Sequence, residues 1–123
     1  MPAFDRAVSA LLEDLEARGL QAETLVLSCG EFGRTPKLNK QAGRDHWGFC
    51  QSPLLAGGGV RGGQVYGASD RHGAYPQSQP VHPYDLIATL YHALGIDPRT
   101  QYRDTLNRPR GLVEHGGPIV GLF

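Results

Sequence analysis

Apolar side chains recur at helical spacing in two stretches of the chain. In residues 3–18 they form one stripe, and Gly19 follows directly. Residues 83–94 repeat the pattern behind Pro83 and stop at Gly95. Proline favours the first helical turn, and glycine favours the position just past the last turn. The pattern therefore predicts two amphipathic helices, and the second is expected to bury the stripe Leu86, Ile87, Leu90, Tyr91 and Leu94.

Two short apolar runs predict strands. Residues 24–29 and 53–56 lack polar alternation, which is typical of strands buried on both faces of a parallel sheet. A helix, a tight link and a buried strand make half of a parallel α/β unit. The segment 60–67, "VRGGQVYG", predicts a small β-hairpin around Gly62-Gly63. The long stretch 30–52 between the two strands is expected to be a loop, and the residues after 97 a tail over the domain.

Length and charge limit the classes of function. A chain of 123 residues predicts a single domain over residues 1–123. It carries 12 basic and 12 acidic side chains, and this balance argues against nucleic acid and membrane surfaces as partners. Met1 leads into the first helix without the pattern of a signal peptide. The two cysteines make no disulfide framework, and Cys29, inside an apolar strand, is expected to be buried.

Reactive side chains gather in the loop that follows the first strand. Glu31 comes two residues after the end of that strand, where ligands of open α/β sheets collect. The segment "GRDHW" then places Asp45 beside His46, a pair that suits a divalent metal. Two alternatives stay open: Glu31 as a surface carboxylate paired with Arg34, and His46 as a loop histidine packed against Trp47.

Two arginines flank the same loop. Arg34 and Arg44 carry guanidinium forks that match the oxygens of phosphate and sulfate, so both are candidates for substrate binding. The alternative is that they form salt bridges with Glu31 and Asp45. His82, just before the second helix, is expected to be a helix end group. No Ser-His-Asp spacing and no phosphate-binding glycine loop is present in the sequence.

Three segments resemble one known family. "GEFGRTP", "GRDHW" and "GGQVYGASD", together with "PVHPYDLIATLYHALGIDP", are similar to the C-terminal part of the bacterial domain-of-unknown-function 1501 (DUF1501) family, and the resemblance covers residues 3–123. That family resembles the alkaline phosphatase and sulfatase superfamily. The resemblance implies a three-layer α/β/α fold with a short, mostly parallel sheet. It also implies a divalent metal ion (Zn, Mn, Mg or Ca), with Glu31 and His46 as ligands, and a small anionic ester as substrate.

Two departures from the superfamily pattern shape the functional hypothesis. Where relatives carry Asp-His at the strand end, this chain has Glu31-Phe32, which makes Asp45 the candidate replacement ligand. The N-terminal half that carries the nucleophile in relatives has no counterpart here. The resemblance thus implies a fragment of a sulfatase- or phosphatase-like metallohydrolase, inactive until completed by an N-terminal segment or by a second copy of the chain. The alternative is a non-catalytic binding or scaffold module. Relatives are often exported.

Overall fold

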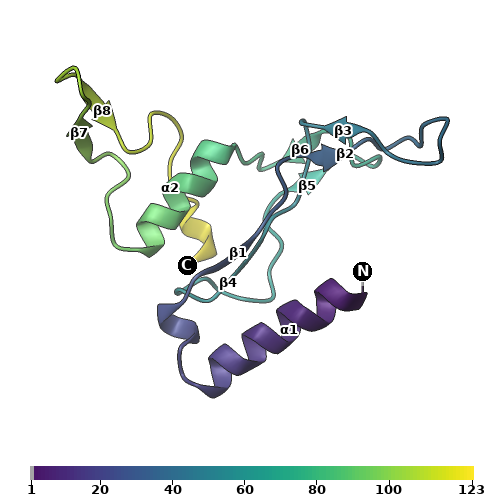
Figure 1. The fold of residues 1–123 in the computed structure, drawn as a ribbon, viewed down its shortest axis with the longest axis horizontal. Helices are drawn as coiled ribbons and strands as arrows, with labels where there is room; N and C mark the ends of the chain where they lie inside the picture. The colour runs from purple at the N-terminus through teal and green to yellow at the C-terminus, as the bar shows by residue number, and fades with distance from the viewer. Residues whose placement is uncertain (1) are drawn as a thin grey trace. The chain divides into compact units, whose positions relative to one another are not determined.

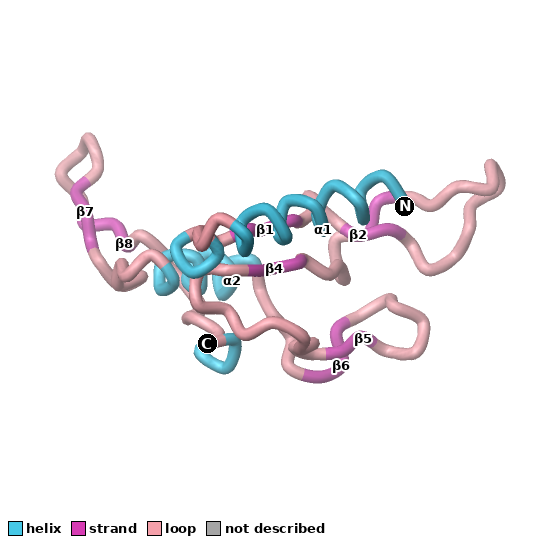
Figure 2. Tube along the Cα trace, turned by 90° about the horizontal axis from the view of Figure 1, so that it is seen from below, coloured by secondary structure: helices cyan, strands magenta, loops and turns pink. Residues whose placement is uncertain are grey.

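The computed structural model describes residues 2–123, which form two α-helices joined to short strands by long loops (Figure 1). The α-helices are α1 (Pro2–Ala17) and α2 (Pro83–Ala93), and two 3-10 turns are η1 (Gln21–Glu23) and η2 (Val120–Leu122). Figure 2 shows how little of the described chain lies in strands. The strands are β1 (Val26–Ser28), β2 (Gly33–Arg34), β3 (His46–Trp47), β4 (Leu54–Ala56), β5 (Ala68–Ser69), β6 (Pro76–Ser78), β7 (Gln101–Arg103) and β8 (Pro109–Gly111).

Both predicted helices are confirmed to within a residue at each end. Gly19 and Gly95 follow them with positive φ angles of 70° and 74°, as helix-ending glycines do. The prediction of the buried stripe on α2 was wrong. Ile87 and Leu94 are exposed, and the helix buries the small residues Ala88 and Thr89 instead.

The predicted three-layer α/β/α fold with a mostly parallel sheet is not what the described residues form. Their sheets are four two-stranded pairs: β1 with β4, β2 with β3, β5 with β6, and β7 with β8. The last three pairs are antiparallel. Parallel strands need a long crossover connection, which is usually a helix. The described residues contain two α-helices, α1 and α2, which is too few to connect the strands of a wide parallel sheet. Apolar runs of four to six residues therefore misled the prediction, because they become strands of only three residues.

Three smaller predictions were also wrong. Residues 60–67 contain no strand, so the hairpin around Gly62-Gly63 is absent there, and hairpins form at β5–β6 and β7–β8 instead. Cys29 is exposed rather than buried. The strands β1 and β4 are only half-buried or exposed, because each lies in a two-stranded pair.

The described chain divides into two compact units. One comprises residues up to 26, 55–62 and 82–123, and the other comprises residues 27–54 and 63–81. The buried residues within 2–123 are Ala88, Thr89 and Leu122, so the core lies where α2 meets the C-terminal segment of the first unit. The predicted site residues all belong to the second unit. Neither described helix has the length and apolar character needed to cross a membrane.

Candidate functional site

The predicted site residues lie on and around the β2–β3 ribbon of the second unit. In its register Gly33 pairs with Trp47, and Arg34 pairs with His46. The pairing continues one residue further, where the backbone N–H of Thr35 donates to the carbonyl oxygen of Asp45 at 3.0 Å. Cross-strand partners in an antiparallel pair have neighbouring side chains on one face. The ribbon therefore brings Arg34 and His46, 12 positions apart in the sequence, side by side.

Gly33 is required by the close approach of a neighbouring backbone. A Cβ atom at this position would lie 1.9 Å from the carbonyl oxygen of Cys50. Real side chains never come so near to a backbone atom, and the backbone here cannot move as a flexible side-chain tip would. The motif "GEFGRTP" therefore has a structural reason for its second glycine, one residue before Arg34.

Phe32 lies against both partners of the Arg34–His46 pair. Its ring centroid is 4.0 Å from that of His46, with an angle of 33° between the rings. The guanidinium carbon of Arg34 lies 5.8 Å from the same ring centroid, within the range of a cation–π contact. We call these three residues the Phe32 platform. The sequence analysis assigned no role to Phe32; the available signal was its spacing of two residues from Arg34, which places both on one face of an extended segment.

The guanidinium of Arg34 has no hydrogen-bond or ion-pair partner within residues 2–123, and its side chain is exposed. The expected alternative, a salt bridge with Glu31, does not form among these residues: Glu31 is exposed and has no described polar partner. The fork of Arg34 is therefore held against an aromatic ring while its N–H groups remain open to a ligand from solvent.

Arg44 is placed differently from Arg34. Its Nη1 donates to the carbonyl oxygen of Thr35 at 2.6 Å and also to the carbonyl oxygen of Pro36. These bonds join the two ends of the loop between β2 and β3. The Nη1 group of Arg44 is therefore already used in hydrogen bonds to the backbone. Arg44 forms no salt bridge with Asp45 among the described residues.

Asp45 and His46 do not converge on a common point. Successive residues of an extended strand point to opposite faces. Asp45 Oδ1 accepts from Asn39 Nδ2 at 2.9 Å, whereas His46 lies on Phe32. No group of three histidine, cysteine or acidic side chains able to hold a metal ion exists among residues 2–123. The metal assignment of Glu31, Asp45 and His46 stays a prediction, and the donors as placed do not make a metal shell.

Asn39 organises the loop that carries Arg44 and Asp45. Its Oδ1 accepts from the backbone N–H groups of Gln41 and Gly43, at 3.0 and 2.9 Å. Such bonds from asparagine to nearby backbone are a typical way to fix a tight turn. The stretch 30–52, predicted to be one long loop, therefore contains β2 and β3, and Asn39 orders the turn between them.

Trp47 faces the other side of the ribbon from His46. Its Nε1 donates to the carbonyl oxygen of Ala74 at 2.6 Å, which ties the ribbon to the β5–β6 turn. The rings of Phe49 and Tyr75 lie 5.0 and 5.6 Å from that of Trp47. In the same turn the Ala74 backbone N–H lowers the pKa of the Asp70 carboxyl, whose Oδ1 accepts it at 2.9 Å. These contacts explain how the second unit holds together with so few strand residues.

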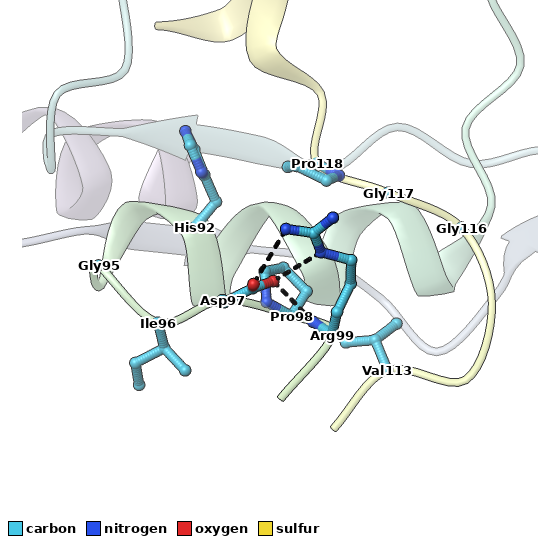
Figure 3. Close-up of a pocket in the computed structure, with 10 residues that line it drawn as sticks. All are labelled: His92, Gly95, Ile96, Asp97, Pro98, Arg99, Val113, Gly116, Gly117 and Pro118. Carbon is cyan, nitrogen blue, oxygen red and sulfur yellow. Dashed lines mark hydrogen bonds and ion pairs between the residues drawn. The ribbon is translucent and has the colours of Figure 1, made fainter. Parts of the chain in front are cut away.

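A cavity of about 590 Å³ lies in the first unit, at the C-terminal end of α2 (Figure 3). None of the five predicted site residues lines it. Its charged groups are already paired, since Arg99 donates to both carboxylate oxygens of Asp97 at 3.1 Å. The Arg99 guanidinium lowers the pKa of Asp97, and Asp97 in turn raises the pKa of Arg99. The cavity is lined by His92, Gly95, Ile96, Asp97, Pro98, Arg99, Val113, Gly116, Gly117 and Pro118.

Comparison with known proteins gives one clear result. No curated protein and no solved structure matches the chain. One family model, described as a protein of unknown function, matches over residues 1–123. That match agrees with the resemblance carried by the motifs around Arg34 and His46. The chain is therefore a member of the DUF1501 family.

Proposed function

We propose that this chain supplies the oxyanion-binding part of a hydrolase that acts on sulfate or phosphate esters. The observation that carries the proposal is the pair Arg34–His46, in register on the β2–β3 ribbon and packed on Phe32. The fork of Arg34 is exposed and has no described polar partner. It offers two parallel N–H donors to two oxygens of a tetrahedral anion.

The platform suits an anion better than a single surface arginine does. The cation–π contact with Phe32 favours one placement of the guanidinium, which reduces the conformational entropy lost when its N–H groups bind a ligand. His46 is the cross-strand neighbour of Arg34 in the ribbon. Arginine binding to the transferring group would stabilise the charge that collects on its oxygens during displacement. Arg34 is therefore the residue to which we assign the main substrate contact.

The ester class rests on the motif resemblance to the alkaline phosphatase and sulfatase superfamily. Members of that superfamily use divalent metals and an in-line displacement at phosphorus or sulfur. The donors Glu31, Asp45 and His46 do not fit a metal shell as they are placed, so we derive no catalytic step through a metal ion. Ser69, one candidate hydroxyl, donates to the Asp70 carbonyl oxygen at 3.1 Å and forms no hydrogen bond with a histidine in the described chain.

Hydrolysis of the ester would then need a nucleophile and further ligands from outside the described residues. We propose an N-terminal segment or a second copy of the chain as the source of these groups. Support comes from α1, which buries none of its residues and leaves Phe4 and Leu11 45% and 46% exposed. A helix whose apolar side chains are left partly exposed has room for a partner on that face. Sedimentation velocity at increasing protein concentration tests whether the chain self-associates. A chain that stays monomeric would argue against a second copy as the partner.

The experiment that tests the proposal uses phenyl sulfate and phenyl phosphate with the isotope-labelled chain. Amide shifts are recorded by NMR during the titration, and phenol release is measured in the same samples. We expect saturable shifts confined to residues around Arg34 and His46, and no phenol release by the isolated chain. Shifts that do not saturate, or that spread without relation to the platform, would overturn the assignment. Rapid release of phenol would overturn the claim that the chain only binds.

A non-catalytic binding module is the second candidate. One observation favours it: residues 2–123 bring no metal-binding group of three side chains together. Both candidates predict anion binding at Arg34, and they differ in whether the bound ester is cleaved once the rest of a hydrolase is supplied. Phenol release on addition of an N-terminal segment from a full-length relative would favour the hydrolase. Binding without release under the same conditions would favour the module.

A further inference from the structure

The helix α2 turns its small side chains inward and its large apolar side chains outward. The face around Ala88 and Thr89 is buried against the C-terminal segment, where the Thr89 hydroxyl accepts from the Ile119 backbone N–H at 3.0 Å. On the opposite face Ile87 and Leu94 are 42% and 67% exposed. Isoleucine and leucine are among the residues most often buried in folded proteins. The orientation of α2 is therefore explained if another surface covers its outward face.

The outward face of α2 has the geometry of a helix-packing site. A groove of about 270 Å³ lies between four of its side chains, at positions i, i+3, i+4 and i+7. These side chains are Ile87, Leu90, Tyr91 and Leu94. Where helices pack knobs into holes, four residues of one helix form the hole that receives a side chain of the other helix. None of the four carries a charge, so the groove suits an apolar side chain from a second helix.

The four side chains are complementary to a second copy of themselves. If two α2 helices run antiparallel about a two-fold axis midway between Leu90 and Tyr91, Ile87 of each copy lies opposite Leu94 of the other. A two-fold dimer uses the same patch of both subunits in this way. The N-terminus of each helix, which His82 caps as the sequence predicted, then lies beside the C-terminus of the other. Opposite ends of the two helix dipoles attract each other in that arrangement.

The chain also exposes enough surface for such an interface. It exposes 9222 Å², whereas a folded monomer of 13.3 kDa exposes about 6,500 Å². The difference of about 2,700 Å² exceeds the roughly 800 Å² that each partner loses in an interface of standard size. Tyr84 and Ile96, just outside the two ends of the groove in the sequence, are also exposed. A second copy can therefore bury apolar surface beyond the four residues of the groove.

We propose that two copies of the chain pair through this face of α2, in antiparallel orientation, with Ile87 of each copy against Leu94 of the other. In naming a second copy as the partner, the inference rests on the part of the proposed function that requires one. It does not depend on anion binding at Arg34, which belongs to the other compact unit. The partner is identified by an uncharged helix face that fits itself.

Nuclear Overhauser effects between copies test the register of the pair. A sample that mixes isotope-labelled and unlabelled chains reports contacts between copies separately from contacts within one chain. We expect a dimer in sedimentation velocity, with contacts between the methyl groups of Ile87 and those of Leu94 in the other copy. A chain that stays monomeric would overturn the pairing. A dimer in which Ile87 contacts Phe4 of the other copy instead of Leu94 would overturn it as well.

Substitutions on the outward face test the same contact by affinity. Ile87→Lys should raise the dissociation constant of the dimer about tenfold or more, because the side chain occurs twice in the interface and each copy loses an apolar partner. Leu94→Glu should have a similar effect. Leu106→Lys is the matched control, since Leu106 is 69% exposed between β7 and β8, and it should change the constant less than about twofold. Equal weakening by Leu106→Lys would overturn the assignment of the face.

A mixture of two variants tests the antiparallel register. One chain with Ile87→Lys and one with Leu94→Glu should pair with each other more tightly than either pairs with itself. Their introduced charges meet at one end of the interface, and the unchanged Leu94 and Ile87 meet at the other. Lack of this rescue, between variants that circular dichroism shows to be folded, would overturn the register. If a variant fails to fold, the contacts between wild-type copies still decide the question.

The pairing and the anion site can fail separately. A monomer whose amide shifts around Arg34 saturate with phenyl sulfate would overturn the pairing and leave the anion site in place. A dimer with the expected contacts between Ile87 and Leu94, but without saturable shifts around Arg34, would support the pairing and overturn the anion site.

Discussion

Thr89 and Ile119 are joined by a hydrogen bond across 30 positions of the sequence. The hydroxyl of Thr89 accepts from the Ile119 backbone N–H at 3.0 Å and donates to the Asp85 carbonyl oxygen at 2.6 Å. Thr89 is 0% exposed, so both bonds lie in the core of the first unit. One side chain of α2 thereby fixes the C-terminal segment.

Replacing Thr89 by valine should destabilise the chain although the volume is kept. The change leaves the Ile119 N–H without its acceptor in a water-poor place, which typically costs about 1–3 kcal/mol. Urea denaturation followed by circular dichroism measures the loss. Thr105→Val, at an exposed position, is the matched control and should change stability by less than about 0.5 kcal/mol. Equal effects of the two substitutions would refute the role of the Thr89 hydroxyl.

Gly116 should tolerate alanine less well than Gly19 does. Both have positive φ, 76° and 70°, so alanine costs about 1–2 kcal/mol at either position. A Cβ at Gly116 would also lie 2.4 Å from Asp85 Oδ1, whereas Gly19 has open space. Displacing that carboxylate breaks its bond to Gly117, which adds about 1 kcal/mol. Thermal melts of the two variants compare the losses, and an equal fall in Tm would contradict the Asp85 contact.

Gly33→Ala should separate the two strands of the site. The added carbon would lie 1.9 Å from the Cys50 carbonyl oxygen, while Gly48 in the same segment has nothing within 4 Å of a Cβ. Gly33→Ala should therefore abolish the cross-strand nuclear Overhauser effects between Arg34 and His46, together with anion binding. Gly48→Ala should preserve both. Intact cross-strand contacts in Gly33→Ala would show that the described ribbon is not the arrangement in solution.

The β7–β8 hairpin should loosen in acid because of Asp104. The Arg108 backbone N–H, the largest cause, lowers the pKa of Asp104 from its ordinary value of 3.8. The charged carboxylate therefore stabilises the hairpin at pH values above 3.8, and this contribution is lost as the pH falls below it. Amide exchange of residues 101–111 at pH 5.5 and 2.5 should differ in the wild type more than in Asp104→Asn. An identical response of the two would contradict this assignment.

How far the sequence predicts this chain can be judged from particular residues. Helical periodicity and the glycines at 19 and 95 predicted both helices, because those signals are local. The pairing of Arg34 with His46 depends on the course of a loop of 11 residues, fixed by Asn39 and Arg44, and no periodicity encodes it. Proximity in the sequence even suggested the wrong grouping, since Asp45 and His46 are adjacent but point apart.

The prediction of the fold class was wrong for a related reason. Short apolar runs look the same whether their strand sits in a wide parallel sheet or in a two-stranded pair. Only the connections distinguish the two cases, and here they are glycine-rich loops rather than helices. Placing Arg34 in the loop was enough to identify it as a candidate anion contact. Its aromatic support from Phe32 appeared only once the strands were paired.

The most direct test of the central claim is the affinity of sulfate and phosphate for the wild-type chain and for Arg34→Ala, measured by calorimetry at constant ionic strength. Arg71→Ala, which removes one positive charge from the β5–β6 turn of the same unit, is the control. The account predicts that Arg34→Ala weakens binding about tenfold or more, the usual worth of charge-assisted hydrogen bonds, and that Arg71→Ala changes it less than about twofold. Equal affinities of Arg34→Ala and the wild type would contradict the assignment of Arg34 as the oxyanion contact.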